Sequence, residues 1–503
     1  MRRQTAVLLL ALLLGTCRAA PPAEGLRPPA VAGSFYPAER SRLEAALRDL
    51  LADARPARHE PPIALVLPHA GYAFSGQIAA DGWKQAEGLA LDVVVLLAPN
   101  HTVAPFRGIS VSRATGYRTP LGVAAVDRDL AARLAGTCPE ATWRPEAHAR
   151  EHAEEVQVPF IQTLFPRAHI LPCVFGTSDP EMARRFGRAL AEALRGRRAL
   201  VVASSDLSHF PTQARAEVAD RATLAALAEL DAGAFQRTVR EVERLEGVDT
   251  AACGQGPVLA VMEVARRLGA RRGTILSYAN SGGTVHGEPG RVVGYGAAMF
   301  TAGAPGRDLA ALAPPAAPSG RPLDAAERRA LLQLARRTLE AHCRTGIPPL
   351  PRPDSAELFR PGGAFVTLRH RESLRGCIGT LQGEAPLALT VARMALRSGL
   401  ADPRFPPVEA GDLGGLTIEV SILTPLRPVS DSREIVPGRD GVLLEKDGRS
   451  AVFLPQVATE QGWGREALLD QLSLKAGLPK GAWRQGARFW TFRAEVFAEP
   501  RRP

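Results

Sequence analysis

The sequence is poor in lysine and in aromatic residues, and these two shortages limit the partners it can have. Only Lys84, Lys446, Lys475 and Lys480 are lysines, so the 62 basic residues and the net charge of +10 come almost entirely from arginines scattered along the 503-residue chain. A nucleic-acid-binding surface needs basic residues clustered on one face. Because the aromatic content is only 5% and no dense basic helix occurs, we predict that nucleic acid is not a partner.

Cysteines are few, and none of them forms a CxxC pair, which argues against a structural zinc ribbon. Cys17 lies in the N-terminal apolar region. Removal of that region would leave five cysteines: Cys138, Cys173, Cys253, Cys343 and Cys377. In an exported protein, this odd number means that at least one thiol is free, bound to a metal or paired outside the chain.

The apolar run at the N-terminus is too short to span a membrane as a stable helix. Residues 1–20 combine a basic start, apolar residues 6–14 and small residues after them, which is the layout of an export signal. We therefore predict a signal peptide over 1–20 and a periplasmic or extracellular protein. Cleavage near Ala19 or Ala20 and lipoprotein processing at Cys17 are the two alternatives, and a lipid anchor at Cys17 would be the only expected contact with a membrane.

An Ala/Pro/Gly-rich linker over 302–323 divides the chain into domains over 25–301 and 324–500. In the first domain, short apolar runs alternate with helical patterns, which indicates an α/β fold with a central, mainly parallel sheet covered on both faces. The predicted strands are 63–68, 92–98, 170–175, 199–205 and 274–279. The second domain is predicted to be a smaller α+β unit, with helices near 324–343 and 386–398 and strands over 363–370, 376–379 and 417–425.

Three predicted strands of the first domain end in ionisable side chains. His69 follows IALVLP, His101 follows VVLLAPN, and Asp206 and His209 follow the apolar part of ALVVASSDLSH. Any one of these histidines could simply satisfy a loop. Since ligands collect beyond the carboxyl ends of strands in such sheets, four such groups at three strand ends indicate one shared site.

Cys253 is the next candidate, in DTAACGQGPVLAVMEVARRLG just ahead of a strongly patterned helix. The positive end of that helix is expected to favour a thiolate. Two imidazoles and a thiolate, His69, His101 and Cys253, can fill one face of a coordination sphere and leave positions open. Iron, zinc and copper all accept this set, so ligand identity alone does not choose among them.

The segment HAREHAEEVQVPF offers a rival site. His148 and His152 are four residues apart, as are Glu151 and Glu155, so a continuous helix would place each pair on one face. We prefer the strand ends for the metal, and expect His152 and Glu155 to lie nearby as orienting or acid/base groups.

The two domains resemble two known families. The first resembles the Memo family through RPPAVAGSFYP, PHAGYAFSG, APNH, EHAEEVQVPF, SSDLSHF, YANSGG and VVGYGAAMF, and the second resembles the AMMECR1 family through LRGCIGT, DPRFPP and TIEVSILTP. These families occur fused, as proteins B and A of the AmmeMemoRadiSam system, which implies a radical-SAM partner. The predicted export signal would separate this chain from a cytosolic partner of that kind.

The resemblance implies a fold related to class III extradiol dioxygenases, which use Fe(II) and oxygen. It places the metal on His69, His101 and Cys253, makes His209 the acid/base residue and puts Asp206 beside it. The dioxygenases have a carboxylate where this chain has Cys253, so ring cleavage does not carry over. We expect an iron- or copper-dependent oxidoreductase or redox protein, with Fe(II) first. The alternatives are a zinc hydrolase and a non-catalytic protein that binds a peptide or small anion beside a structural metal.

Overall fold

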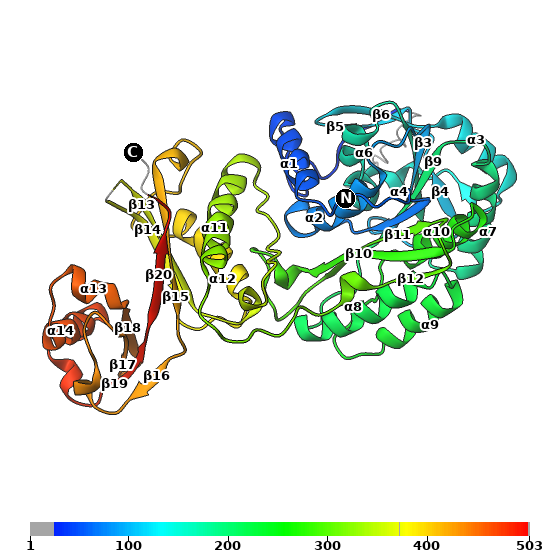
Figure 1. Cartoon of the computed structure of the whole chain (residues 1–503). Coiled ribbons are helices and arrows are strands. Elements are labelled where there is room, and N and C mark those ends of the chain that lie inside the picture. The colour runs from blue at the N-terminus through cyan, green and yellow to red at the C-terminus, as the bar shows by residue number, and fades with distance from the viewer. Residues whose placement is uncertain (1–24, 372, 501–503) are drawn as a thin grey trace, which may run out of the picture.

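The computed structural model describes residues 25–371 and 373–500. An α/β domain holds the N-terminal part of the chain, and a second domain with two smaller sheets holds the rest (Figure 1). The predicted signal peptide and Cys17 lie outside the described residues. Within those ranges, no helix is both long and apolar enough to cross a membrane.

The α/β domain is built on a sheet of nine strands in the order β12-β10-β11-β2-β9-β3-β8-β4-β7. Its strands are β2 Ala64–Leu67, β3 Val93–Pro99, β4 Ile109–Val111, β7 Ala141–Thr142, β8 His169–Phe175, β9 Ala199–Ser204, β10 Arg272–Asn280, β11 Gly294–Thr301 and β12 Gly306–Asp308. The central strands β2, β9, β3 and β8 pair in parallel, whereas β11 is antiparallel to both β2 and β10. The sheet is therefore mixed, with a parallel centre at the positions that the apolar runs predicted.

Both faces of this sheet are buried, which explains why its strands read as continuous apolar runs. Along β3, Val93, Val95 and Leu97 pack into one hydrophobic core, whereas Val94 and Leu96 pack into another on the opposite face. Helices cover both faces: α1 Arg40–Ala52, α2 Tyr72–Trp83, α3 Arg128–Thr137, α4 Pro145–Ala149, α5 His152–Glu155, α6 Val158–Leu164, α7 Pro180–Ala193, α8 Gln213–Ala228, α9 Ala232–Val242 and α10 Gln255–Arg267.

Two features of the first domain were not predicted. One is a small sheet of β1 Leu26–Arg27, β5 Gly116–Thr119 and β6 Gly122–Ala125. The other lies in the predicted linker, where residues 306–308 form β12 and pair in parallel with β10, and Leu312 packs into the core. The first domain therefore extends beyond residue 301. This extension was not predicted, because backbone pairing to an edge strand needs no apolar pattern.

The second domain is α+β, as predicted, but it contains two sheets. The first has the order β14-β13-β15-β20, with β13 Ala364–His370, β14 Ser373–Thr380, β15 Leu416–Leu423 and β20 Ala494–Ala498, and it shares a core with α11 Ala325–Thr345 and α12 Leu387–Leu400. The second has the order β16-β19-β17-β18, with β16 Arg427–Val429, β17 Gly441–Lys446, β18 Arg449–Phe453 and β19 Arg488–Phe492, and it packs with α13 Pro455–Glu460 and α14 Arg465–Lys475.

All five cysteines in the described ranges are free thiols. Cys377, on β14, is only half-buried, and the hydroxyl of Thr367 on the neighbouring strand donates a hydrogen bond to its Sγ at 3.3 Å. The thiol of Cys377 is therefore only partly shielded from solvent.

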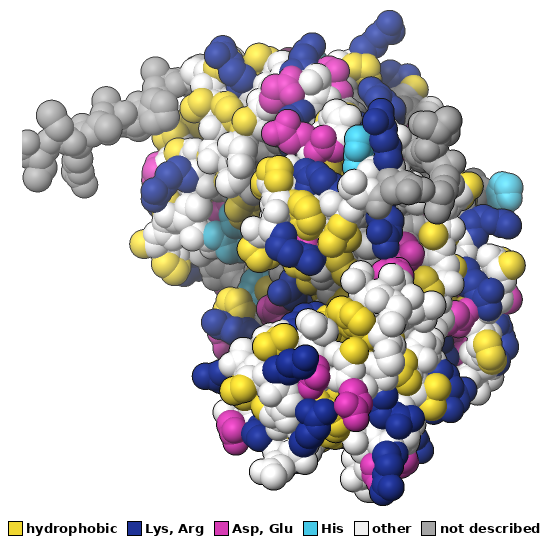
Figure 2. Space-filling view, turned by 90° about the vertical axis from the view of Figure 1, so that its left-hand side faces the viewer, with side chains coloured by type: hydrophobic (Ala, Val, Ile, Leu, Met, Phe, Trp, Pro, Cys, Tyr) yellow, Lys and Arg dark blue, Asp and Glu magenta, His cyan; other side chains and the backbone are white. Residues whose placement is uncertain are grey.

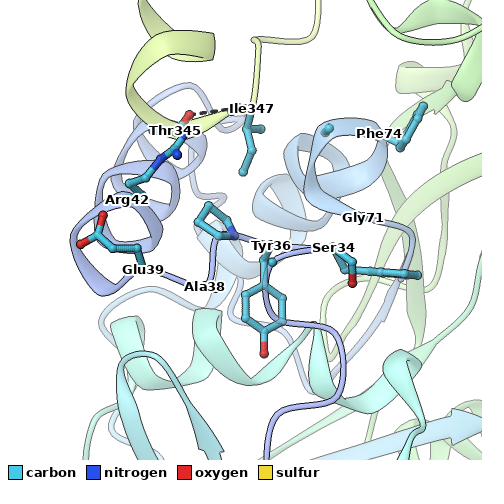
Figure 3. Close-up of a pocket in the computed structure, with 14 residues that line it drawn as sticks. Ser34, Tyr36, Ala38, Glu39, Arg42, Gly71, Phe74, Thr345 and Ile347 are labelled. Carbon is cyan, nitrogen blue, oxygen red and sulfur yellow. Dashed lines mark hydrogen bonds between the residues drawn. The ribbon is translucent and has the colours of Figure 1, made fainter. Parts of the chain in front are cut away.

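Helix α11 joins the second domain to the first through ion pairs with α1 and with the residue that follows the end of α1. Arg337 pairs with Asp53, and Arg344 pairs with Asp49. Beyond the end of α11, Ile347 faces the loop that contains Ala38 across a pocket of about 420 Å³ (Figure 3). On the face shown in Figure 2, basic and acidic side chains are interspersed, in keeping with the absence of clustering in the sequence.

Candidate metal centre

His69, His101 and Cys253 come together at one edge of the parallel centre of the sheet. His69 and His101 follow the carboxyl ends of β2 and β3, which flank β9, and Cys253 lies just before α10. One ligand atom from each of the three lies within 4.8 Å of the others. The Sγ of Cys253 is 3.2 Å from Nε2 of His69. Three segments that are distant in the sequence therefore form one potential metal-binding group.

The hydrogen bonds of His69 fix which of its nitrogens faces the cluster. The hydroxyl of Ser204 donates to the carbonyl of Ala153 at 2.6 Å, so its oxygen accepts from Nδ1 of His69 at 3.0 Å. The proton on Nδ1 leaves the lone pair on Nε2, the atom beside Cys253. The backbone N–H of His69 donates to Asp206 at 2.8 Å, which holds the buried ring in place.

Glu151 orients His101 in the same way. The backbone N–H of His101 donates to one carboxylate oxygen of Glu151 at 2.7 Å, and its Nδ1 lies 2.9 Å from the other. Glu151 is fully buried and also caps α5 by accepting from the N–H of Ala153 at 2.9 Å. A carboxylate on Nδ1 leaves Nε2 of His101 for a metal and makes it more basic. Sequence reasoning missed this role, although an acidic residue at a helix start is a capping signal.

His152 lies beside the cluster, as expected. Its ring stacks on His101 with the centroids 4.7 Å apart, and its Nδ1 is 3.4 Å from Glu151. His101, Glu151 and His152 also form a second group whose ligand atoms lie within 4.8 Å of one another. Both groups use His101, which is the most exposed of the three residues proposed as ligands.

The structure places Glu155 in a different role from the one expected. Its carboxylate accepts hydrogen bonds from the Tyr36 hydroxyl at 2.6 Å and from the N–H groups of Ala30 and Val31 at 2.8 and 3.0 Å. It also forms a buried ion pair with Arg27. Because these partners occupy both oxygens, Glu155 anchors the N-terminal segment, and an acid/base role is not supported.

The rival site does not form on one helix face. The chain breaks into α4 and α5 between His148 and His152, so the four-residue spacing no longer aligns them. The ring of His148 is buried among Tyr117, Glu154 and Ser110, at 2.9 to 3.1 Å. His148 is therefore a structural residue with satisfied hydrogen bonds.

Asp206 and His209, which were expected to lie side by side, form no hydrogen bond with each other within the described residues. Asp206 is bonded to the backbone of His69. The backbone of His209 donates to the Thr250 carbonyl at 3.0 Å and accepts from the N–H of Asp249 at 3.1 Å, and its ring packs against that of Phe210 with the centroids 5.5 Å apart. Its Nε2 is buried and has no hydrogen-bond partner among the described residues. Asp206 therefore orients the backbone of His69 rather than the ring of His209.

Burial governs the protonation of the cluster. It lowers the pKa of His69 well below its usual value, aided by the charges of His101 and His152, and it raises the pKa of Asp206 to about 7. Burial, followed by the charge of Asp206, also raises the pKa of the Cys253 thiol. The helix start therefore does not by itself produce the thiolate that the sequence suggested.

These properties fit a metal ion. A metal needs neutral imidazoles, which burial favours at His69, and a coordinating cation deprotonates a thiol outright. Two nitrogen donors with hydrogen-bonded Nδ1 atoms and one sulfur donor suit iron, copper or zinc with open positions. The unpaired Nε2 belongs to His209, whose pKa is lowered by burial and then further by the charge of His101, which is close enough to act on the ring.

Comparison with known proteins gives the chain its family. The family model described as Memo-like protein matches residues 27–299, and that described as AMMECR1 matches residues 332–497. MEMO1 family proteins of Methanosarcina mazei and Aquifex aeolicus are each 37% identical over 276 residues, which is 54% and 55% of this chain and 98% and 99% of theirs. A crystal structure of an uncharacterised protein from Pyrococcus horikoshii is 39% identical and covers 34% of this chain and 92% of its own, with a TM-score of 0.33. The chain therefore belongs to the Memo family and has an AMMECR1 domain at its C-terminal end.

Proposed function

We propose that this protein is a metal-dependent oxidoreductase or redox protein, with an iron or copper ion held by His69, His101 and Cys253. The observation that supports it is the grouping of these three side chains, whose ligand atoms lie within 4.8 Å of one another although they come from three separate segments. Glu151 and Ser204 fix the two imidazoles so that each offers Nε2. When bound, the metal would supply Lewis acidity and redox chemistry to oxygen or a small substrate.

The residues around this group have separate tasks in the proposal. His209, whose Nε2 is buried without a partner, accepts or releases a proton at that atom. Burial lowers the pKa of His209, so the ring is neutral near pH 7 and can act as a base. Asp206 keeps the backbone of His69 in place.

Metal analysis of the purified full chain tests the proposal. Wild type and His101→Ala should differ sharply in bound metal, because the variant lacks one of three ligands. His169→Ala is the matched control, since His169 is exposed at the start of β8, away from the cluster. Equal metal content in wild type and His101→Ala would remove His101 from the metal site.

The reaction class needs a second experiment, because a zinc hydrolase would use the same ligands. The protein is loaded anaerobically with Fe(II), and oxygen uptake is followed with catechols as probe substrates. Oxygen uptake that requires His209 supports the redox assignment. Hydrolysis of ester probes by the zinc-loaded protein, without oxygen uptake by the iron-loaded protein, would replace it with the hydrolytic one.

A binding protein without catalysis is the second candidate. A cavity of about 1260 Å³ lies between the two domains, and its lining includes Gln213, His286 and Arg397. This cavity is lined by both polar and apolar side chains and is large enough for a peptide or a small anion. Binding of a ligand there that survives His69→Ala would favour this candidate, whereas binding that needs both metal and His69 favours the first.

A further inference from the structure

A loop over residues 281–293 connects the second domain to the neighbourhood of His209. Arg393, on α12 of the second domain, donates hydrogen bonds to three backbone carbonyls of this loop, those of Gly282 at 2.9 Å, Thr284 at 3.0 Å and Gly287 at 2.5 Å. Helix α12 lies on the side of the second domain that faces the first (Figure 1). The half-buried Arg393 side chain therefore binds a glycine-rich loop of the first domain at three backbone positions, across the junction between the domains.

The same loop pairs with the segment that carries His209. His209 forms an antiparallel bridge with Val293. The N–H of Phe210 donates to the Val292 carbonyl at 2.7 Å, and the N–H of Val292 donates to the Pro211 carbonyl at 2.9 Å. A displacement of the loop would therefore be passed to the backbone of His209.

The backbone is what positions His209. Its Nε2 has no partner among the described residues, so no hydrogen bond at that atom orients the ring. The next residue, Phe210, has a φ of 73°, a conformation that non-glycine residues avoid. Besides the bond to Val292, the guanidinium of Arg291, also in the loop, stacks on the Phe210 ring at 3.8 Å from its centroid. The loop thus holds a strained residue next to the candidate proton carrier.

We propose that the second domain positions His209 through Arg393, so that docking of the AMMECR1 domain completes the site in the Memo domain. Arg393 is a positioning residue: it acts on the loop, and the loop acts on the segment from His209 to Gln213. The role of His209 rests on the proposed function, whereas the coupling between the domains does not. It also gives a physical reason for the two domains to share one chain.

Hydrogen exchange of the full-length protein, followed by mass spectrometry, tests this coupling without any metal. In Arg393→Ala, peptides covering 281–293 and peptides covering 207–213 should both exchange roughly tenfold faster than in wild type. Arg393→Lys keeps one cationic donor and should give an intermediate effect. Arg397→Ala is the matched control, because Arg397 lies one turn further along α12, lines the same cavity and, within the part of the chain that the structure describes, forms no hydrogen bond with the loop.

Chemical modification tests whether the accessibility of the His209 ring changes as well. Diethyl pyrocarbonate should modify His209 faster in Arg393→Ala than in wild type or Arg397→Ala, and Arg393→Lys should restore most of the protection. Unchanged exchange over 207–213 in an Arg393→Ala protein whose 281–293 loop has loosened would overturn the proposal. Equal effects of Arg393→Ala and Arg397→Ala would overturn it as well. Failure of wild type to bind metal would refute the proposed function and leave this coupling standing.

Discussion

Replacing Glu151 with glutamine should weaken metal binding without removing a ligand. The carboxylate accepts from the N–H of His101 at 2.7 Å, from Nδ1 of His101 at 2.9 Å and from the N–H of Ala153 at 2.9 Å. Glutamine has the same shape but keeps one acceptor oxygen and turns the other position into a donor. One of the two bonds to His101 therefore becomes a contact between two donors.

The magnitude follows from the role of such carboxylates. Loss of a group that orients a ligating histidine typically lowers metal affinity about 10- to 100-fold, which corresponds to about 1.4 to 2.7 kcal/mol. Folding should also weaken, because a buried donor loses its partner at a cost of about 1 to 3 kcal/mol. Competition with a chromophoric chelator measures the affinity, and urea denaturation measures the free energy of unfolding.

Glu154→Gln is the matched control for this experiment. Glu154 is also fully buried on α5, but it bonds to Tyr117 and His148, away from the cluster. It should lose a similar amount of stability and keep the wild-type metal affinity. Equal losses of affinity in the two variants, or no loss in Glu151→Gln, would refute the assignment of Glu151 to His101.

Three further predictions concern pH, packing and proton transfer. Burial raises the pKa of Asp220 to about 6, so the folded protein holds this proton more tightly than the unfolded chain, and stability should fall as pH rises from 4 to 6. In urea titrations, Asp220→Asn should remove up to about 3 kcal/mol of this decline, and an unchanged decline would contradict the reasoning. At Gly254, a Cβ would lie 2.5 Å from the Ser204 carbonyl oxygen, so Gly254→Ala should displace the adjacent Cys253 and lower metal affinity. The control is Gly187→Ala, whose Cβ would lie 2.8 Å from the backbone of α10 and which should lower only stability. His209→Gln should retain metal but lose most of any oxygen uptake, roughly 100-fold or more for the loss of an acid/base group; full uptake would remove His209 from the mechanism.

The positions of His69 and His101 were predictable because a doubly buried strand leaves a local signature. A continuous apolar run marks the strand, and the first polar residues after it must lie at the edge of the sheet. Cys253 was predictable in position for a similar reason, since a strong helical pattern begins just after it. Its protonation was not, because burial by distant segments outweighs the local helix end.

The relations between side chains could not be predicted from local patterns. Glu151 lies at the break between α4 and α5, where it bonds to His101, whereas the residue spacing was equally compatible with one unbroken helix. Arg393 meets its loop across 106 to 111 residues of sequence. The second sheet of the C-terminal domain is likewise held by pairings between distant strands, whose register no short apolar run specifies.

The most direct test of the metal site is X-ray absorption at the edge of the metal that the full-length protein binds. If His69, His101 and Cys253 are the ligands, the spectrum will contain one sulfur scatterer at roughly 2.3 Å together with nitrogen or oxygen neighbours. In Cys253→Ser that sulfur contribution will disappear. A shell without sulfur in wild type, or a sulfur contribution that persists in Cys253→Ser, would contradict the assignment.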